Sequence, residues 1–296
     1  MKLSESQLSD LSRTPETPDG LTAYSEAWVR EALAASPTLD GVEYSVFSTG
    51  SMKHGTNITF SDLDFLVVQH SASTDSRSRF EQWRTLRASV SAALVTQLGG
   101  IGLTETNKCL NIDSNPDDLP SLDILPCLSL TEGEPGAAIE FWTAQDASPI
   151  HIVSHPGLHT ANSTVKNTNT AGEYRNTVRA LKAIKGVLAQ GGLDPATAPS
   201  HLLECLAHNL PDRYFDGDTA ETARIITETV LNGNNLSKMT TVSGAYKLFG
   251  GGATQWKPAD AKVFFEGAAD ILPDSRRTAY PTLSPASSKM PASLAA

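Results

Sequence analysis

The chain has 296 residues, 40% of them hydrophobic and 19% charged, a balance typical of a globular protein large enough for two packed units. Its net charge of −10 argues against nonspecific coating of nucleic acid, because neutralising phosphates requires surplus Lys and Arg. The sequence contains no apolar run of transmembrane length and no signal-peptide centre, and its three cysteines are widely spaced. We therefore expect a cytoplasmic protein with reduced thiols and no membrane partner.

The first half of the chain mixes helical and strand patterns. Apolar residues at helical spacing predict helices over 21–36 and 79–100, the second ended by a double glycine. Short apolar runs bounded by turn residues predict strands at 43–50, 63–69, 120–130 and 139–144. This half is expected to be an α/β unit.

Helical patterns dominate after about residue 160, with helices predicted over 172–190, 200–210, 218–232 and 258–270. Both ends of the chain are rich in small and polar residues, which offer little to bury. We therefore predict four parts: a flexible segment over 1–20, an α/β core over 21–160, a helical domain over 161–280 and a flexible tail over 281–296.

Two carboxylates stand at the entrance to a hydrophobic strand. Asp62 and Asp64 flank Leu63, and residues two apart in a strand face the same side. A bare pair of this kind is more often one turn residue and one solvated strand residue. Neighbouring like charges persist most easily around a divalent cation, however, and a third carboxylate, Asp123, lies inside the later apolar run SLDILP. The three together predict a metal site.

A small-residue pair precedes these carboxylates. Gly50 and Ser51 follow a predicted strand, and ten residues separate Ser51 from Asp62. Small residues there let backbone N–H groups and a hydroxyl approach a phosphate closely. A phosphate-sized loop beside three carboxylates indicates metal-assisted phosphoryl transfer.

The run GSMKHGTNITFSDLDFLVV resembles the signature of nucleotidyltransferases of the DNA polymerase β superfamily. Gly55-Thr56, Ser61 and the later LDILP are similar to the cyclic GMP-AMP synthase-like and oligoadenylate synthase-like branch. The runs HPGLHTANSTVKNTNTAGEYRNTVRALKAIKG, PSHLLECLAHNLP and LFGGGATQWKPADAKVFF resemble bacterial, DncV-like members. The resemblance implies an α/β + α fold, in which a polymerase β-like nucleotidyltransferase core precedes a helical, oligoadenylate-synthase-like second domain.

The same resemblance implies roles for particular residues. It makes three carboxylates catalytic and ligands of two Mg²⁺ (or Mn²⁺) ions, with the last also a base: Asp62, Asp64 and Asp123. It implies that four residues bind the nucleotide phosphates: Gly50, Ser51, Lys182 and Ser200. The residues alone leave other readings open for the last two. Lys182 also fits a solvated basic stripe, and Ser200 also fits a helix N-cap after Pro199.

The histidines and tryptophans carry weaker signals. His151, His155 and His159 are spaced by four, but Pro156 and Gly157 should break a helix there, so we expect no metal site. His54 is expected at the surface or near a phosphate. The tryptophans considered are expected in the core: Trp83, Trp142 and Trp256.

These features together predict an enzyme that joins nucleoside triphosphates, with pyrophosphate release, into a cyclic di- or oligonucleotide messenger for antiphage signalling. Its expected partners are the nucleotides and regulatory or effector proteins, and no long nucleic acid. Two alternatives remain open. One is untemplated synthesis of linear oligonucleotides or tailing of RNA, and the other is nucleotidyl transfer to a small molecule or a protein.

Overall fold

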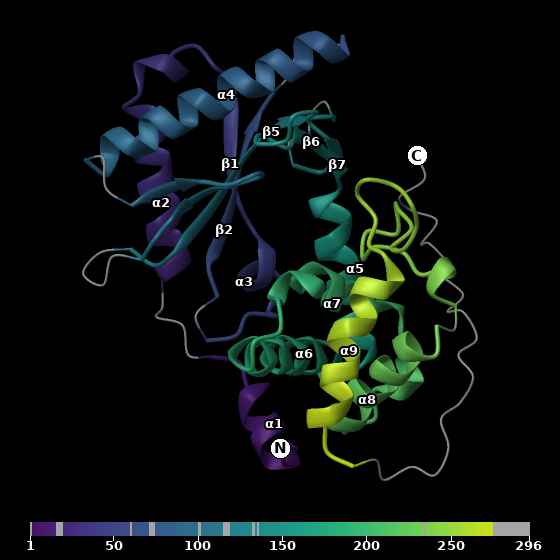
Figure 1. Ribbon diagram of the computed structural model, residues 1–296. Coiled ribbons are helices and arrows are strands. Elements are labelled where there is room, and N and C mark those ends of the chain that lie inside the picture. The colour runs from purple at the N-terminus through teal and green to yellow at the C-terminus, as the bar shows by residue number, and fades with distance from the viewer. Residues whose placement is uncertain are drawn as a thin grey trace. The chain divides into compact units, whose positions relative to one another are not determined.

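The structure, a computed structural model, describes residues 2–15, 20–59, 61–70, 75–99, 102–114, 119–131, 134, 136–233 and 235–274 (Figure 1). The chain divides into two compact units. We call residues 14–161 the sheet unit, and residues 1–13 with 162–296 the helical unit. The predicted flexible tail over 281–296 lies outside the described residues, and the four-part division remains a prediction.

The sheet unit is built on a seven-stranded sheet. Five strands follow one another across it in the order β1 (Tyr44–Thr49), β2 (Leu63–Gln69), β5 (Leu122–Ser129), β4 (Leu110–Ile112) and β3 (Leu103–Glu105). Off this path, β6 (Ile139–Trp142) pairs with β5, and β7 (His151–Ser154) pairs with β6. The neighbours β2 and β5 run parallel, whereas the other pairs are antiparallel.

Helices α2 (Leu21–Ala34) and α4 (Ser76–Gln97) pack against this sheet (Figure 1). The Trp83 side chain of α4 is buried, and its indole N–H donates to the Pro126 carbonyl at 3.0 Å. The helices η1 (Pro37–Leu39) and α3 (Gly50–His54) flank β1. Burying the alternate residues Leu63 and Phe65 fixes the register of β2 and turns Asp64 to the opposite face.

The helical unit packs several helices around α6 (Glu173–Gln190), whose Tyr174, Val178 and Leu181 are fully buried as the helical spacing predicts. Its other long helices are α7 (Ser200–Asn209), α8 (Thr219–Leu231) and α9 (Pro258–Ile271). Short 3₁₀ helices connect them: η2 (Pro195–Thr197), η3 (Asp212–Tyr214) and η4 (Leu236–Lys238).

The N-terminal segment, expected to be flexible over 1–20, contains helix α1 (Glu5–Leu11). Leu8 is 1% exposed and belongs to the core of the helical unit. The backbone N–H of Leu3 donates to the Ile271 carbonyl at 2.7 Å, and the Arg179 guanidinium donates to the Ser12 carbonyl at 2.6 Å. The chain therefore begins in the helical unit before it enters the sheet unit.

The expectation that Pro156 and Gly157 break a helix is wrong, because helix α5 spans Pro156–Asn169. Proline is tolerated at the first position of a helix, where an N–H would have no intrahelical partner. His151 lies in β7, His155 precedes α5 and His159 lies within it, so these three residues do not share a helix. Among the described residues, no helix is both long and apolar enough to cross a membrane.

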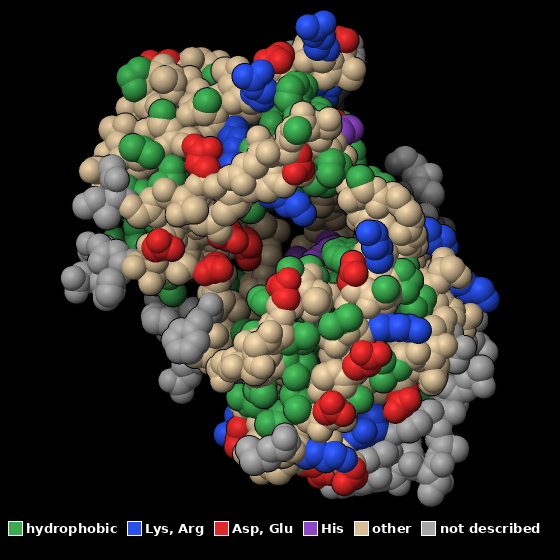
Figure 2. All heavy atoms as spheres, viewed as in Figure 1, with side chains coloured by type: hydrophobic (Ala, Val, Ile, Leu, Met, Phe, Trp, Pro, Cys, Tyr) green, Lys and Arg blue, Asp and Glu red, His purple; other side chains and the backbone are tan. Residues whose placement is uncertain are grey.

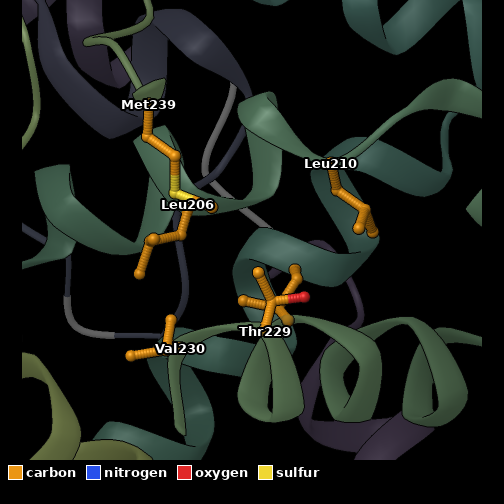
Figure 3. Close-up of a pocket in the computed structure, with 6 residues that line it drawn as sticks. Leu206, Leu210, Thr229, Val230 and Met239 are labelled. Carbon is orange, nitrogen blue, oxygen red and sulfur yellow. The ribbon is translucent and has the colours of Figure 1, made fainter. Parts of the chain in front are cut away.

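A small pocket lies in the helical unit between α7 and α8 (Figure 3). Its walls are almost wholly apolar: Leu206, Leu210, Ile226, Thr229, Val230 and Met239. The hydroxyl of Thr229 donates within its own helix to the Ile225 carbonyl at 2.7 Å. With no charged group in its lining, this pocket is a packing gap and offers no group for catalysis.

Candidate active site

A row of polar residues crosses one face of the sheet. Asp64 of β2 is paired in register with Asp123 of the parallel strand β5. On either side, Thr49 of β1 pairs with Asp64, and Asn111 of β4 pairs with Asp123. Residues paired across neighbouring strands point to the same face, so the two carboxylates lie side by side. We call Thr49, Asp64, Asp123 and Asn111 the carboxylate row.

Asp62 lies just outside this sheet. As the sequence predicted, β2 begins one residue after Asp62, at Leu63, whose backbone N–H donates to the Ser121 carbonyl at 2.9 Å. The side chain of Asp62 is exposed, yet its charge acts on the row. Burial, followed by the charge of Asp62, raises the pKa of Asp123 to about 6, against a lowering by the hydrogen bond from Asn111. We call the three predicted carboxylates, Asp62, Asp64 and Asp123, the carboxylate cluster.

Gly50 stands directly against Asp64. Its φ is +69°, and a Cβ atom added there would lie 1.8 Å from Asp64 Oδ2. Only glycine satisfies both the left-handed backbone and this close approach. The predicted loop over Gly50 and Ser51 is instead the start of the five-residue helix α3, with Thr49 at its N-cap.

The chain returns from α3 to β2 through a tight turn. Gly55, with φ of +68°, ends α3 in the left-handed conformation, and the backbone N–H of Thr56 donates to the Ser51 carbonyl at 2.9 Å. Farther along, the backbone N–H of Ile58 donates to Ser61 Oγ at 2.9 Å. Gly55, Thr56 and Ser61, which carry part of the family resemblance, thus shape the turn that leads to Asp62 at the start of β2.

His54 is not at the surface, where it was expected as one of two placements. Its side chain is 6% exposed and stacks on His159, with ring centroids 4.2 Å apart. Thr160 Oγ1 lies 3.3 Å from His54 Nε2. The tryptophans Trp83 and Trp142 are buried in the sheet unit as expected.

Lys182 and Ser200 belong to the helical unit, on α6 and α7. Lys182 does not lie on a solvated stripe, because its side chain is 4% exposed and its Nζ donates to Glu204 Oε1 at 2.7 Å. Ser200 is exposed and is the first residue of α7. The N-cap is Pro199, so the alternative reading of Ser200 as the cap is wrong. Their role as triphosphate contacts remains a prediction.

The carboxylate cluster has the donor set that Mg²⁺ and Mn²⁺ prefer. Three carboxylates supply oxygen atoms, and burial, followed by the like charge of Asp62, raises the pKa of Asp123, an effect that a bound cation would oppose. A further acceptor is ready beside them, because Asn111 Oδ1 is buried and accepts no hydrogen bond within the described chain. A water molecule bound to a cation would supply such a donor. The residues therefore fit a divalent cation.

Asn111 was not among the residues singled out from the sequence. It donates through Nδ2 to Asp123 Oδ1, yet it lies in a strand of three residues. The sole local signal was a polar residue between Leu110 and Ile112, which is common in any half-buried strand.

Residues 161–273 match the family described as the cGAS/DncV-like nucleotidyltransferase C-terminal helical domain. The chain is 29% identical over 244 residues to the cyclic UMP-AMP synthase of Rhodothermus marinus, covering 76% of this chain and 83% of that protein. It is 23% identical over 269 residues to the cyclic dipyrimidine nucleotide synthase CdnE of Legionella pneumophila, covering 84% and 90%.

Comparison with solved structures shows the same likeness. The R. marinus CdnE c-UMP-AMP synthase with Apcpp and Upnpp aligns with a TM-score of 0.71 and 26% identity, covering 90% of this chain and 96% of that one. The Elizabethkingia meningoseptica CdnE cyclic dinucleotide synthase aligns with a TM-score of 0.74 and 24% identity, covering 91% and 98%, and shows the shared fold. The chain thus has the fold of bacterial cGAS/DncV-like nucleotidyltransferases, with a polymerase β-like core and a match to that family's helical domain.

Proposed function

We propose that this enzyme joins nucleoside triphosphates into a short cyclic oligonucleotide with release of pyrophosphate. The observation that carries the proposal is the register of Asp64 and Asp123, two carboxylates side by side on parallel strands, with Gly50 against the first. In the same proposal the product is a messenger in antiphage signalling within the cytoplasm, and regulatory or effector proteins are further partners.

Each residue of the cluster has a proposed task. Asp62 and Asp64, with Asp123 as a third ligand, would hold two Mg²⁺ or Mn²⁺ ions. Bound cations at such a site neutralise triphosphate charge and lower the pKa of an attacking hydroxyl. The absence of a side chain at Gly50 leaves room for the Asp64 carboxylate, and Gly50 and Ser51 would hold the β- and γ-phosphates. Lys182 and Ser200 remain the proposed contacts of the triphosphate in the helical unit.

The bond changes follow from this arrangement. The hydroxyl oxygen of one nucleotide bonds to the α-phosphorus of another, and the bond from that phosphorus to the bridging oxygen breaks. Pyrophosphate leaves with the electron pair, and the hydroxyl proton passes to the carboxylate of Asp123. A second transfer of the same kind closes the ring.

A short product suits the surface of the protein. On the face shown in Figure 2, Lys and Arg side chains stand singly or in small groups among acidic ones, and the described residues form no broad basic patch there. A net charge of −10 would also repel a long polymer at moderate salt. The relatives named above are a cyclic UMP-AMP synthase and a cyclic dipyrimidine nucleotide synthase, which favours a ring containing a pyrimidine nucleotide.

Product analysis tests the proposal. Purified enzyme is incubated with labelled ATP, GTP, CTP and UTP, each alone and in pairs, with Mg²⁺ or Mn²⁺. We expect a product of two to four nucleotides that resists phosphatase, has the mass of a ring and needs no primer. A ladder of linear oligonucleotides, or a strict requirement for a primer, would support the linear alternative instead.

Single amide substitutions supply the controls. Asp64→Asn and Asp123→Asn should each abolish pyrophosphate release without unfolding the protein, because they remove a like charge and keep the side-chain volume. Asp40→Asn removes an exposed carboxylate of the same unit and should leave the rate unchanged. If Asp64→Asn keeps near wild-type turnover, the assignment of the carboxylate cluster is wrong.

A further inference from the structure

The carboxylate row contains one neutral side chain that touches a carboxylate. Asn111 of β4 lies opposite Asp123 of β5, and its Nδ2 donates to Asp123 Oδ1. On the other side of Asp123 stands Asp64, in register on β2. Asp123 is therefore held between a like charge and a single amide donor from the described strands, and that donor restricts the rotation of its carboxylate.

The position of Asn111 is itself fixed by a buried arginine. The Arg87 side chain of α4 is buried, and its guanidinium donates to the carbonyls of Lys108 and Thr106 at 2.8 Å each, and to that of Cys109 at 3.4 Å. These carbonyls form the turn that leads from β3 into β4. Five guanidinium donors in a rigid plane suit such a turn, which lies two residues before Asn111.

The turn also closes on itself. Thr106 Oγ1 donates to the Cys109 carbonyl at 2.9 Å, and the backbone N–H of Cys109 lies 3.1 Å from Thr106 Oγ1. The backbone N–H of Thr106 donates to the Cys109 carbonyl at 3.0 Å. A strand as short as β4 would otherwise fray, and the hydrogen bonds of this turn hold its first residue in place. These hydrogen bonds fix the position of Asn111 relative to Asp123 on β5.

A second polar atom of Asn111, the side-chain oxygen Oδ1, lacks a hydrogen-bond donor among the described residues. This oxygen is buried. A buried carbonyl without a donor is costly, and this one lies beside Asp123, so a water molecule bound to a cation there could donate to it. The amide thus offers one donor to Asp123 and one acceptor to the site.

From this geometry we propose that Asn111 is a positioning residue, which orients the Asp123 carboxylate for divalent-cation binding and offers its free oxygen to the water shell of that cation. The inference rests on the proposed function of the carboxylate cluster. Groups that orient a metal ligand commonly change metal affinity by about 10- to 100-fold when they are removed. Asn111 should therefore act on cation affinity more than on the fold.

Cation binding measured directly tests the proposal. Mn²⁺ is titrated into the full chain, with a nonhydrolysable nucleoside triphosphate analogue present, and free Mn²⁺ is followed by electron paramagnetic resonance. Asn111→Leu keeps the side-chain volume and removes both polar atoms, and Asn111→Thr is a second variant suited to a strand. We expect each to weaken Mn²⁺ binding by about 10-fold.

Three reference variants separate the outcomes. Thr104→Val alters the residue paired with Asn111 on β3, on the same face but one strand farther from Asp123, and should bind Mn²⁺ as the wild type does. Asp64→Asn and Asp123→Asn should lose binding. If these two bind normally, the proposed function fails; if they lose binding while both Asn111 variants keep wild-type affinity, only the positioning role fails. Thermal unfolding of every variant shows whether it is folded, and at least one folded Asn111 variant decides the question.

Discussion

The two units differ in which charged side chains they place beside one another. In the helical unit, each buried lysine faces a carboxylate: Lys182 pairs with Glu204, and Lys166 pairs with Asp212. In the carboxylate row of the sheet unit, Asp64 lies beside Asp123 instead, and burial, followed by the charge of Asp62, raises the pKa of Asp123. The sheet unit also builds a matched pair, Arg79 with Glu140, on α4 and β6.

The contrast separates two arrangements of charge. A matched pair satisfies itself, so it holds helices or strands in place and needs nothing further. Neighbouring like charges raise the free energy of the metal-free fold, and a bound cation can offset this repulsion. The predictions below run from the largest expected effect to the smallest.

Breaking the buried pair in the helical unit should destabilise that unit strongly. Lys182→Met or Glu204→Gln leaves a partner buried without its counter-charge, which typically costs about 3–5 kcal/mol of unfolding free energy. The double variant Lys182→Met/Glu204→Leu removes both charges and should lose much less than the sum. Urea unfolding of the three variants measures this coupling, and additive losses would contradict a matched pair.

The same variants decide whether Lys182 also contacts the triphosphate. If it does, the double variant should be stable yet show a raised KM for nucleotide, while Glu204→Gln leaves the KM nearer to that of the wild type. Lys257→Met, which removes an exposed lysine of the same unit, is the control. An unchanged KM in the double variant would assign Lys182 to structure alone.

Gly50→Ala should damage catalysis by displacing Asp64. The added methyl would lie 1.8 Å from Asp64 Oδ2, so the carboxylate has to move. Misplacing a catalytic group by about 1 Å can cost about 100-fold in rate, or about 2.7 kcal/mol of activation free energy. Pyrophosphate release measures the loss.

Gly41→Ala is the matched control for this substitution. Gly41 has a similar φ of +75°, but a Cβ atom there meets nothing within 4 Å. It should therefore show only the backbone strain, about 1–2 kcal/mol of stability, with little change in turnover. Equal losses of activity in the two variants would mean that strain, and not the approach to Asp64, accounts for the effect.

The smallest effect concerns pH. Because the pKa of Asp123 rises from 3.8 to about 6 on folding, its protonated form stabilises the metal-free fold at low pH, and this contribution is lost as the pH rises through about 6. In EDTA, the Tm of the wild type should therefore fall relative to that of Asp123→Asn as the pH rises from 3.8 to about 6. Mg²⁺ should raise the Tm of the wild type above pH 6, because the cation binds the carboxylate. Parallel Tm curves for the two proteins would show that Asp123 is not perturbed.

Local pattern was enough to predict much of this protein. The run LDFLVVQ became β2 with the expected bounds, because seven residues with a mostly apolar side-chain pattern have few other ways to be buried. The helices of the second half also lie within a few residues of their predicted limits, since each carries its own apolar stripe and end signals. The spacing of Gly50, Asp62 and Asp64 pointed to the site because these residues are neighbours along the chain.

Tertiary structure decided what depended on distant partners. The pairing of Asp64 with Asp123 comes from a parallel register, and the contact of Asn111 comes from a three-residue strand too short to show a period. The spacing of Lys182 also fitted a solvated basic stripe, whereas in the structure α7 places Glu204 against it. The start of α5 at Pro156 depended on a helix position that the residue type alone does not reveal. Sequence pattern reports what a residue prefers locally, whereas register and packing determine which charge it meets.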